Sequence, residues 1–536
     1  MKLIKSLIII LIISFGYINT YSQEIIAPLT NIDVQHYHFY IAVNDSTNAI
    51  EATAKIEIKF LKETPNISLN LIKKSEDNKG MLVSKVLQND KPVIFEQTEE
   101  LLNITVEKSK QNKNATFTIS YSGIPKDGLI ISKNMFGDRT FFGDNWPNRA
   151  QNWLPCIDYL SDKAFVDFYI TAPVHYQVIA NGSLKEQSNL NQNYTYHHWQ
   201  SSVPLPTDVM VIGIAKFAVQ HLGKVNNIPI SSWVYPQNKE DGFYDYAVAD
   251  KILTYFIKTI GNYPYKKLAN VQSKTRFGGM ENASNIFYYE KSVTGKQDHE
   301  DLLAHEIAHQ WFGDSATESD WPHLWLSEGF ATYLTNLYLE NNSNKETLDT
   351  RLKKQRQKII AFSKKWQKPV VDFNTTNLMR LLNANSYEKG GWFLHMLRRK
   401  LGDNLFNKAL RTYYDTYKLK NADTEDFQKI VQQVSEKDLE VFFNQWLYKV
   451  GQPKLDVQWS FNHKKIKITI AQVQGFDTVF NFPLSIKFIF KDNSSIIKTF
   501  NISQKTEAFK FQSDKEIIKI ELDPNTDLLF EEGIVK

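Results

Sequence analysis

The chain has 536 residues, which is too long for a single hydrophobic core. Of these residues 42% are hydrophobic and 13% aromatic, a composition that excludes a disordered protein. The formal net charge of +4 is small for this length and no basic run or RNA-binding motif occurs, so we expect no nucleic-acid partner. The single cysteine, Cys156, excludes a framework of intrachain disulfides, and we expect it to be a small buried hydrophobe.

Residues 1–22 have the pattern of a secretory signal peptide. Lys2 and Lys5 precede an apolar run at 7–18 that is too short to span a bilayer comfortably as a permanent helix, and polar residues follow it. We therefore expect cleavage near residues 20–23 and export to the periplasm or the medium, with an uncleaved anchor as the alternative. No later stretch is long and apolar enough to cross a membrane, so we expect no stable membrane insertion after cleavage.

Residues 23–224 are predicted to form an N-terminal β domain. Apolar and polar side chains alternate along several stretches, namely 54–60, 115–119 and 167–171. Turn signals separate such strands, at Lys79-Gly80, Asp127-Gly128 and Asn181-Gly182. Because this alternation leaves one face of a sheet packed and the other wet, we expect a large antiparallel β domain.

Two histidines, His36 and His38, occur in an earlier predicted strand of this domain. Their spacing places both side chains on one face of the strand. Because no cysteine or carboxylate cluster accompanies them in the sequence, we expect solvated strand histidines there and not a metal site.

Near residue 250 the pattern changes to helical spacing, with apolar residues at intervals of three and four between 246 and 260. A compact glycine-containing segment follows: Gly278, Gly279, Met280, Glu281 and Asn282. Paired glycines before a carboxylate let the backbone approach a ligand closely, as an edge along which an extended peptide can lie. By itself the segment is more typical of an ordinary glycine turn. Its position about 25 residues before the next motif makes it a candidate for substrate recognition.

Two histidines one helical turn apart, His305 and His309, form the most specific pattern in the chain. In the sequence H-E-I-A-H, both imidazoles project from one face of a helix. Glu328, in the segment W-L-S-E-G-F, adds a carboxylate from a following helix, and zinc held by three such ligands keeps a fourth position open for water. Glu306 is then placed to take a proton from that water. We therefore predict one Zn²⁺ per chain, since a buried helix with this polar seam needs a partner for its polar atoms.

Helical patterns continue to about residue 450, and a period of two returns from Lys454. Helices are expected at 331–339, 392–401 and 427–434, the last after Asp423 as a helix start. Alternation at 466–470 and 484–488 predicts a small closing β-sandwich. The predicted fold class is multidomain α+β, with a signal peptide at 1–22, an N-terminal β domain at 23–224, a zinc catalytic domain at 225–451 and a C-terminal β-sandwich at 452–536.

These spaced motifs resemble those of the aminopeptidase N family, the gluzincin aminopeptidases that include leukotriene hydrolase. The H-E-I-A-H motif, followed after eighteen residues by Glu328, is similar to the zinc site of that family, and the segment at 278–282 to its G-x-M-E-N exopeptidase motif. Tyr387, in the sequence Y-E-K-G, resembles its catalytic tyrosine. The segment N-W-L-P-C-I-D at 152–158 looks like a signature of its N-terminal domain, and the likeness covers about residues 30 to 460.

The resemblance implies a saddle-like antiparallel β domain, a thermolysin-like and mostly helical catalytic domain and a β-sandwich. It also implies a zinc metallo-aminopeptidase that acts on peptides with a free N-terminus. In that reading Glu306 is the general base, Tyr387 stabilises the oxyanion and Glu281 pairs with the α-ammonium of the substrate.

The chain departs from the family pattern in two places. It ends within the expected β-sandwich, so we expect no large helical C-terminal domain. Where relatives carry a Gln or Glu that helps to hold the substrate amine, this chain has Gly143-Asp144-Asn145-Trp146-Pro147, with Asp144 and Asn145 as candidates. Three alternatives remain: a zinc endopeptidase, an epoxide hydrolase on the same site and a catalytically silent peptide-binding scaffold. Cleavage of blocked peptides would indicate the endopeptidase, and activity in a lipid epoxide assay would indicate the epoxide hydrolase. A metal ligand or base replaced in the sequence would indicate the scaffold.

Overall fold

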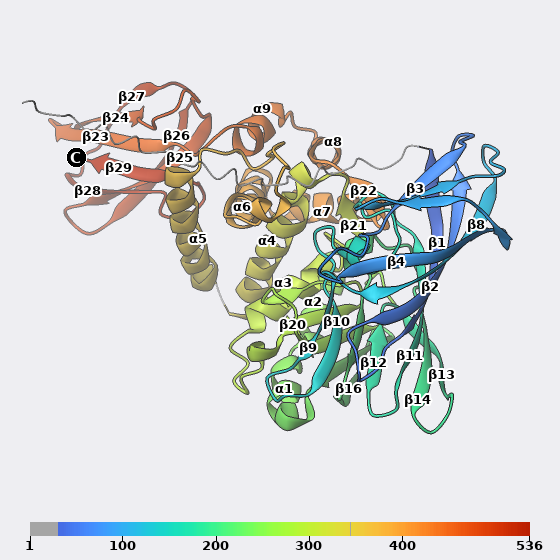
Figure 1. The fold of residues 1–536 in the computed structure, drawn as a ribbon. Helices are drawn as coiled ribbons and strands as arrows, with labels where there is room; N and C mark the ends of the chain where they lie inside the picture. Colours follow the sequence, from blue (N-terminus) through green and yellow to red (C-terminus); the bar gives the residue numbers. More distant parts are fainter. Residues whose placement is uncertain (1–30, 344) are drawn as a thin grey trace, which may run out of the picture.

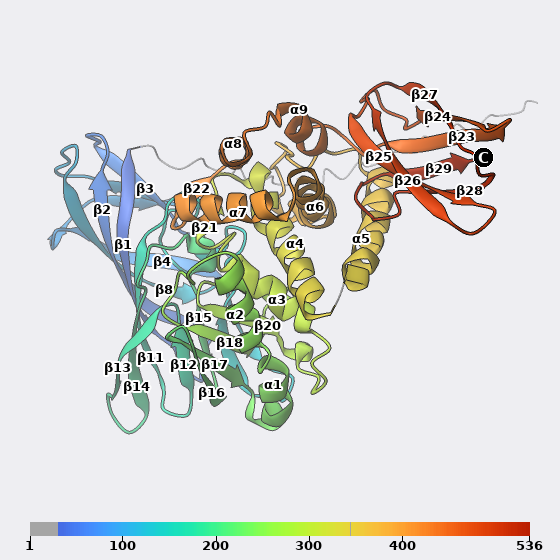
Figure 2. The same ribbon diagram turned by 180° about the vertical axis from the view of Figure 1, so that it is seen from behind.

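The computed structural model describes residues 31–343 and 345–536, so the predicted signal peptide lies outside the described residues. Two β-rich regions lie at opposite ends of the molecule, and a helical body lies between them (Figure 1; Figure 2). The predicted multidomain α+β fold is confirmed. Within the described residues, no helix has both the length and the apolar character needed to cross a bilayer.

Among the described residues, the N-terminal region contains three sheets, and the strands of the largest alternate between buried and more exposed positions. The largest has the order β13-β14-β11-β1-β2-β8-β4-β5, with bounds Ser183–Asn189, Tyr194–Gln200, Phe165–Pro173, Ile32–Ala42, Ile50–Phe60, Asn114–Ile124, Gly80–Gln88 and Lys91–Pro92. A second has the order β12-β15-β10-β9, with bounds Gln177–Ala180, Ile212–Ala215, Arg139–Gly143 and Leu129–Lys133. The third has the order β3-β7-β6, with bounds Asn66–Asn70, Leu101–Thr105 and Phe95–Gln97. Cys156 is fully buried among them, as expected.

One pair in the largest sheet differs from the antiparallel prediction. Strands β1 and β11 pair in parallel, with His38 opposite Asp167 and Tyr40 opposite Tyr169. Every other pair in that sheet is antiparallel. The parallel pair joins the first described strand to one that follows more than 120 residues later, so residues far apart in the sequence become neighbours on one face.

The central region begins with a sheet that the sequence analysis did not anticipate. Its order is β16-β17-β18-β20-β19, with bounds Ala218–Val225, Ile228–Val234, Leu268–Ser273, Asn285–Tyr289 and Gly279–Met280. Strand β18 is buried at every position, so no alternation of polar and apolar residues marks it in the sequence. The sheet begins a few residues before the predicted boundary at 225, and it places β19 at a free edge.

Nine helices and a two-stranded sheet complete the central region among the described residues. The helices α1 to α9 have the bounds Lys239–Tyr246, Ala249–Thr259, Glu300–His309, Trp325–Asn342, Lys345–Lys365, Gly390–Leu401, Asp403–Tyr417, Thr424–Ser435 and Glu440–Phe443. The small sheet pairs β21 with β22, Ala316–Glu318 and Lys420–Ala422. Asp423 caps α8 in a reciprocal arrangement with Asp426, which confirms the predicted helix start.

Helix α4 crosses the start of α6 at two glycines. A Cβ added to Gly329 would lie 2.9 Å from the Cα of Gly390, so a larger residue at either position would push the helices apart. This close approach sets how far the first turn of α4 lies from the π-helical turn at Asn385–Lys389, which precedes α6. The side chains of Glu328 and Tyr387, carried by these two segments, can therefore meet.

The C-terminal region is the predicted pair of packed sheets. One has the order β27-β24-β23-β29 and the other β26-β25-β28, with bounds Thr506–Gln512, Lys465–Gln472, Lys454–Asn462, Glu531–Val535, Ser495–Ile502, Phe482–Phe490 and Ile517–Leu522. Phe488 and Phe511, from different sheets, have ring centroids 5.1 Å apart, and Phe500 and Phe509 have centroids 4.8 Å apart. The sheets therefore bury their aromatic faces against each other.

Arg356 of α5 joins the helical body to these sheets. Its guanidinium donates to Asp523 at 2.7 Å and to the carbonyl oxygen of Leu528 at 2.6 Å. It also lies over the rings of Trp392 and Phe530, at 4.9 Å and 4.7 Å. The Asp523 side chain is only 1% exposed, so its charge depends on this partner.

Replacing Arg356 by Ala should lower the free energy of unfolding of this junction by about 3–5 kcal/mol, because it leaves the buried Asp523 carboxylate without its counter-ion. Urea denaturation followed by circular dichroism measures the loss. Arg399→Ala is the matched control: Arg399 pairs with Asp527 at 2.6 Å, but the two side chains are 42% and 26% exposed. That change should cost about 1 kcal/mol or less. Equal losses for the two variants would contradict the assignment.

Candidate active site

Helices α3 and α4 pack against each other and bring the three predicted metal ligands together. His305 and His309 lie on α3, and Glu328 lies in the first turn of α4. The Nε2 atoms of the two histidines are 3.1 Å apart, and Glu328 Oε2 is 3.2 Å from His305 Nε2 and 3.3 Å from His309 Nε2. Three donor atoms thus converge on one point.

The donor set fits a zinc ion. Bonds of about 2.1 Å at tetrahedral angles place donor atoms about 3.4 Å apart, close to the observed separations. His309 Nδ1 lies 2.9 Å from Ser327 Oγ and 3.2 Å from the carbonyl oxygen of Phe312, and these partners leave Nε2 free to bind a metal. Ser327 was not singled out from the sequence, although it directly precedes Glu328.

Glu306 lies beside this group with an unused oxygen. Its side chain is 4% exposed, and Oε2 has no hydrogen-bond partner among the described residues. Burial raises the pKa of Glu306 well above its ordinary value, and the nearby carboxylate of Glu281 raises it further. A Cβ on Gly279 would lie 2.3 Å from Glu306 Oε1, so this glycine makes room for the carboxylate of the α3 helix.

Glu281 follows directly after the edge strand β19. Its carboxylate, that of Glu306 and a ring nitrogen of His309 lie within 4.8 Å of one another. The side-chain amide of Gln310, the residue after His309, donates from Nε2 to the backbone carbonyl of Glu281, and its Oε1 accepts from the backbone N–H of Ser284 at 2.8 Å. Gln310 therefore fixes the Glu281 backbone to the metal-site helix, a role that the sequence analysis missed and that its place beside His309 could have suggested.

Tyr387 reaches the same point from the π-helical turn. Its hydroxyl donates to Glu328 Oε1 at 2.6 Å, and its ring is stacked 6.0 Å from that of His305. Burial raises the pKa of Tyr387 well above its ordinary value, and the Glu328 carboxylate adds to this effect. The phenol is therefore a hydrogen-bond donor at this site.

The site is electrostatically negative. Burial alone would lower the pKa of His309, but the carboxylates of Glu281 and Glu328 outweigh it and raise that pKa well above the ordinary value. Burial raises the pKa of Glu281 as well, and Glu328 adds to the increase. Three carboxylates around two imidazoles favour a divalent cation, which would offset their mutual repulsion.

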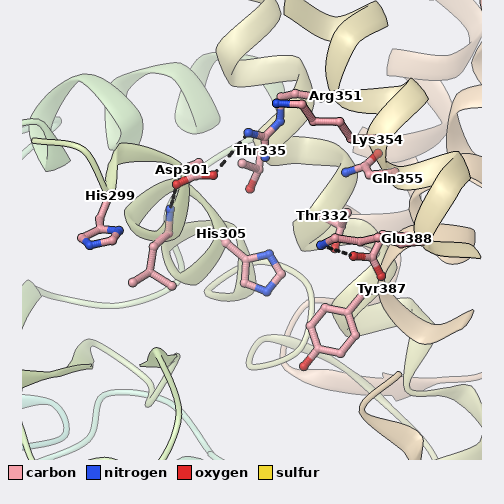
Figure 3. Close-up of a pocket in the computed structure, with 12 residues that line it drawn as sticks. His299, Asp301, His305, Thr332, Thr335, Arg351, Lys354, Gln355, Tyr387 and Glu388 are labelled. Atoms are coloured by element: carbon pink, nitrogen blue, oxygen red, sulfur yellow. Dashed lines mark hydrogen bonds and ion pairs between the residues drawn. The ribbon is translucent and has the colours of Figure 1, made fainter. Parts of the chain in front are cut away.

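Two cavities meet at this group. The smaller, of about 250 Å³, is lined by residues that include Gly278, Gly279, Met280, Glu281, Glu306, Leu382 and the three predicted ligands. The larger, of about 500 Å³, shares Leu302, His305 and Tyr387 with it and extends to Arg351 and Lys354 of α5. Figure 3 shows His305 and Tyr387 at one side of the larger cavity, with the ion pair between Asp301 and Arg351 nearer α5. A smaller cavity at the donor atoms thus adjoins a larger one at these three shared residues.

Three other residues from the sequence analysis lie behind the cavity wall. Asn282 is fully buried and does not line either cavity, and its Nδ2 is 3.5 Å from the Met280 carbonyl oxygen. Asn145 donates to the carbonyl oxygen of Met210 at 2.6 Å, and Asp144 accepts from Arg149 at 2.8 Å. Neither Asp144 nor Asn145 lines either of these two cavities, whereas Trp146 lines the smaller one.

Comparison with known protein families gives one match in the central region and one in the N-terminal β region. Residues 244–446 match the Peptidase family M1 domain, and residues 33–209 match the Peptidase M1 N-terminal domain. The first match contains both predicted ligand helices, the segment at 278–282 and Tyr387.

Curated relatives share about a quarter of their aligned residues with this chain. Aminopeptidase 2, mitochondrial, of Saccharomyces cerevisiae is 27% identical over 484 residues, which are 84% of this chain and 49% of the yeast protein. Probable aminopeptidase 2 of Sulfurisphaera tokodaii is 26% identical over 477 residues, 83% of this chain and 58% of that protein. Glutamyl aminopeptidase of Homo sapiens is 26% identical over 334 residues, 59% of this chain and 34% of the human protein. The chain thus spans less than two thirds of the length of each relative.

Proposed function

Because the chain belongs to peptidase family M1, we propose that it is a zinc-dependent aminopeptidase, which removes the N-terminal amino acid from peptides. The observation that carries the proposal is the meeting of His305, His309 and Glu328 with the Glu281 carboxylate at one cavity. The first three form a metal-binding group, and the fourth is an anion close enough to bind the free amine of a peptide. Hydrolysis of aminoacyl anilides and free dipeptides, with and without a chelator, tests the proposal.

His305, His309 and Glu328 would hold the zinc ion, as the spacing of their donor atoms favours. When bound, zinc acts as a Lewis acid toward the scissile carbonyl and lowers the pKa of a water toward about 7. Glu306 accepts the proton of the attacking water and passes it to the departing amine. Tyr387 donates a hydrogen bond to the oxyanion that develops at the carbonyl carbon.

The edge of β19 and the two cavities give the peptide its path. Within the part of the chain that the structure describes, β19 pairs only with β20, so its other side is open to an extended substrate backbone. The smaller cavity takes the first residue, with Glu281 at the amine, and the larger cavity has room for the residues beyond the scissile bond. The distance from Glu281 to the metal-binding group then selects the first peptide bond.

Replacing Glu281 by Ala should lower kcat/KM for peptides with free amino termini by about 10- to 100-fold, because a charge-assisted hydrogen bond worth about 1.5–3 kcal/mol is lost. Hydrolysis of alanyl anilide and of its acetylated form by both enzymes measures the effect. Acetylated substrate should be poor for the wild type and little changed by the substitution. If the wild type cleaves blocked and free substrates equally well, the protein is an endopeptidase and Glu281 is not an amine anchor.

A further inference from the structure

The sequence analysis expected the two histidines of the first strand, His36 and His38, to be solvated. In the structure they lie against a buried carboxylate instead. The parallel pairing of β1 with β11 places the Asp167 carboxylate beside them, and Asp167 is only 1% exposed. His36 Nε2 lies 2.5 Å from Asp167 Oδ2, and His38 Nδ1 lies 3.5 Å from the same oxygen. The expectation failed because the carboxylate is brought in by a strand more than 120 residues away in the sequence.

A third histidine holds the carboxylate from its other side. His198 of β14 lies with Nε2 2.7 Å from Asp167 Oδ1. The side chains of His36, His38 and His198 are 23%, 15% and 19% exposed, so they are accessible but mostly covered. Asp167 thus has Oδ1 fixed by His198, whereas Oδ2 is turned toward His36 and His38 and lies 3.5 Å from Gln200 Nε2.

Hydrogen bonding within the cluster leaves His38 unsatisfied. Its Nδ1 faces Asp167, and its Nε2 is buried without a hydrogen-bond partner among the described residues, with Glu57 Oε1 3.5 Å away. The rings of His36 and His38 are stacked with centroids 4.0 Å apart. Two imidazoles side by side, facing one buried carboxylate, would both bind a cation that replaces the proton between His36 and Asp167.

We propose that His36, His38 and Asp167 form a second metal site, for a divalent transition-metal ion such as zinc. One nitrogen of each histidine and one carboxylate oxygen lie within 4.8 Å of one another. Two imidazole nitrogens and one carboxylate oxygen are ligands that zinc prefers. His198 orients the carboxylate without binding the ion.

The ion would connect β1 to β11, since its ligands come from both strands. None of these residues lines the cavities of the candidate active site, so the inference does not depend on the proposed function. A metal that binds only the folded state stabilises it. The site lies outside those cavities, so peptide hydrolysis should not require it.

Zinc content of the full-length protein, stripped with a chelator, incubated with Zn²⁺ and desalted, tests this site. We expect two ions per chain in the wild type and one in His36→Gln and in His38→Gln, with hydrolysis of alanyl anilide retained. His309→Ala should also hold one ion, and the double variant His38→Gln, His309→Ala none. His175→Gln is the matched control, since His175 faces a single carboxylate, Asp45, at 3.4 Å in the same part of the chain; it should hold two.

A second measurement separates binding from the catalytic site. Added Zn²⁺ should raise the melting temperature of His309→Ala and leave that of the double variant unchanged. Two ions in His38→Gln, or a single ion in the wild type that His309→Ala removes, would overturn the second site. If the second site is present and the protein hydrolyses no peptide, the proposed function fails and this inference stands.

Discussion

Replacing Glu306 by Gln is expected to lower kcat by about 10²- to 10⁴-fold and to leave the zinc content unchanged. Glutamine keeps the size of the side chain but cannot accept the proton of the attacking water. The Glu306 carboxylate lines the smaller cavity, and its Oε2 has no other partner among the described residues, so the substitution disturbs no hydrogen bond of that atom. Hydrolysis of alanyl anilide and metal analysis of the same preparation measure both quantities.

The metal analysis also separates two roles for Glu306. Its carboxylate lies within 4.8 Å of donor atoms of Glu281 and His309, so it could serve as a ligand instead of a base. Loss of zinc together with activity would assign it as a ligand, and unchanged hydrolysis would exclude the base role. Glu318→Gln is the control: Glu318 is also buried with an unpartnered Oε2, but it lines neither cavity. Its kcat should stay within a few-fold of the wild type.

Local spacing was enough to predict the metal-binding group. His305 and His309 converge because residues four apart share a helix face, whatever the rest of the fold does. The start of α8 at Asp423 was predictable for the same reason, since the cap and its partner Asp426 are three residues apart. Interactions within one helical turn are determined by the sequence around them.

The reason for the glycine pair was only partly predictable. We expected the pair to let the backbone approach a ligand, and β19 does form a free sheet edge at the cavity. However, the space beside Gly279 is filled by Glu306, and a Cβ on Gly278 would meet nothing closer than Leu302 at 3.8 Å. Gly279 therefore accommodates the proposed base, and this fact depends on how α3 packs on β19.

Contacts between distant strands could not be predicted from alternation. Strands β18 and β20 are buried on both faces, so their sequences lack the period of two and the central sheet was missed. The pairing of β1 with β11 was missed because the residue pattern of a strand does not show which strand it pairs with. The carboxylate beside His36 and His38 was missed for the same reason. The proposed second metal site therefore follows from strand pairing, whereas the first follows from helix geometry.

Replacing Tyr387 by Phe is expected to lower kcat by about 10²- to 10³-fold with little change in KM, because a hydrogen bond to the oxyanion acts only in the transition state. The phenyl ring keeps its stacking on His305 and loses only the hydroxyl, which donates to Glu328 Oε1 at 2.6 Å. Because Glu328 is also a proposed ligand, the hydroxyl could act by orienting that carboxylate instead. Steady-state kinetics with alanyl anilide and a zinc-affinity titration of the same variant distinguish the two.

If Tyr387 only orients Glu328, the Tyr387→Phe enzyme should bind zinc about 10- to 100-fold more weakly and regain the wild-type kcat at saturating zinc. If Tyr387 stabilises the oxyanion, the Tyr387→Phe enzyme should keep the wild-type zinc affinity and have a low kcat at every zinc concentration. Tyr333→Phe is the matched control, because Tyr333 is fully buried and its hydroxyl lies 3.0 Å from His395 Nδ1, away from both cavities. It should leave kcat unchanged, and a loss there as large as for Tyr387 would mean that the effect comes from packing and not from the hydroxyl at Glu328.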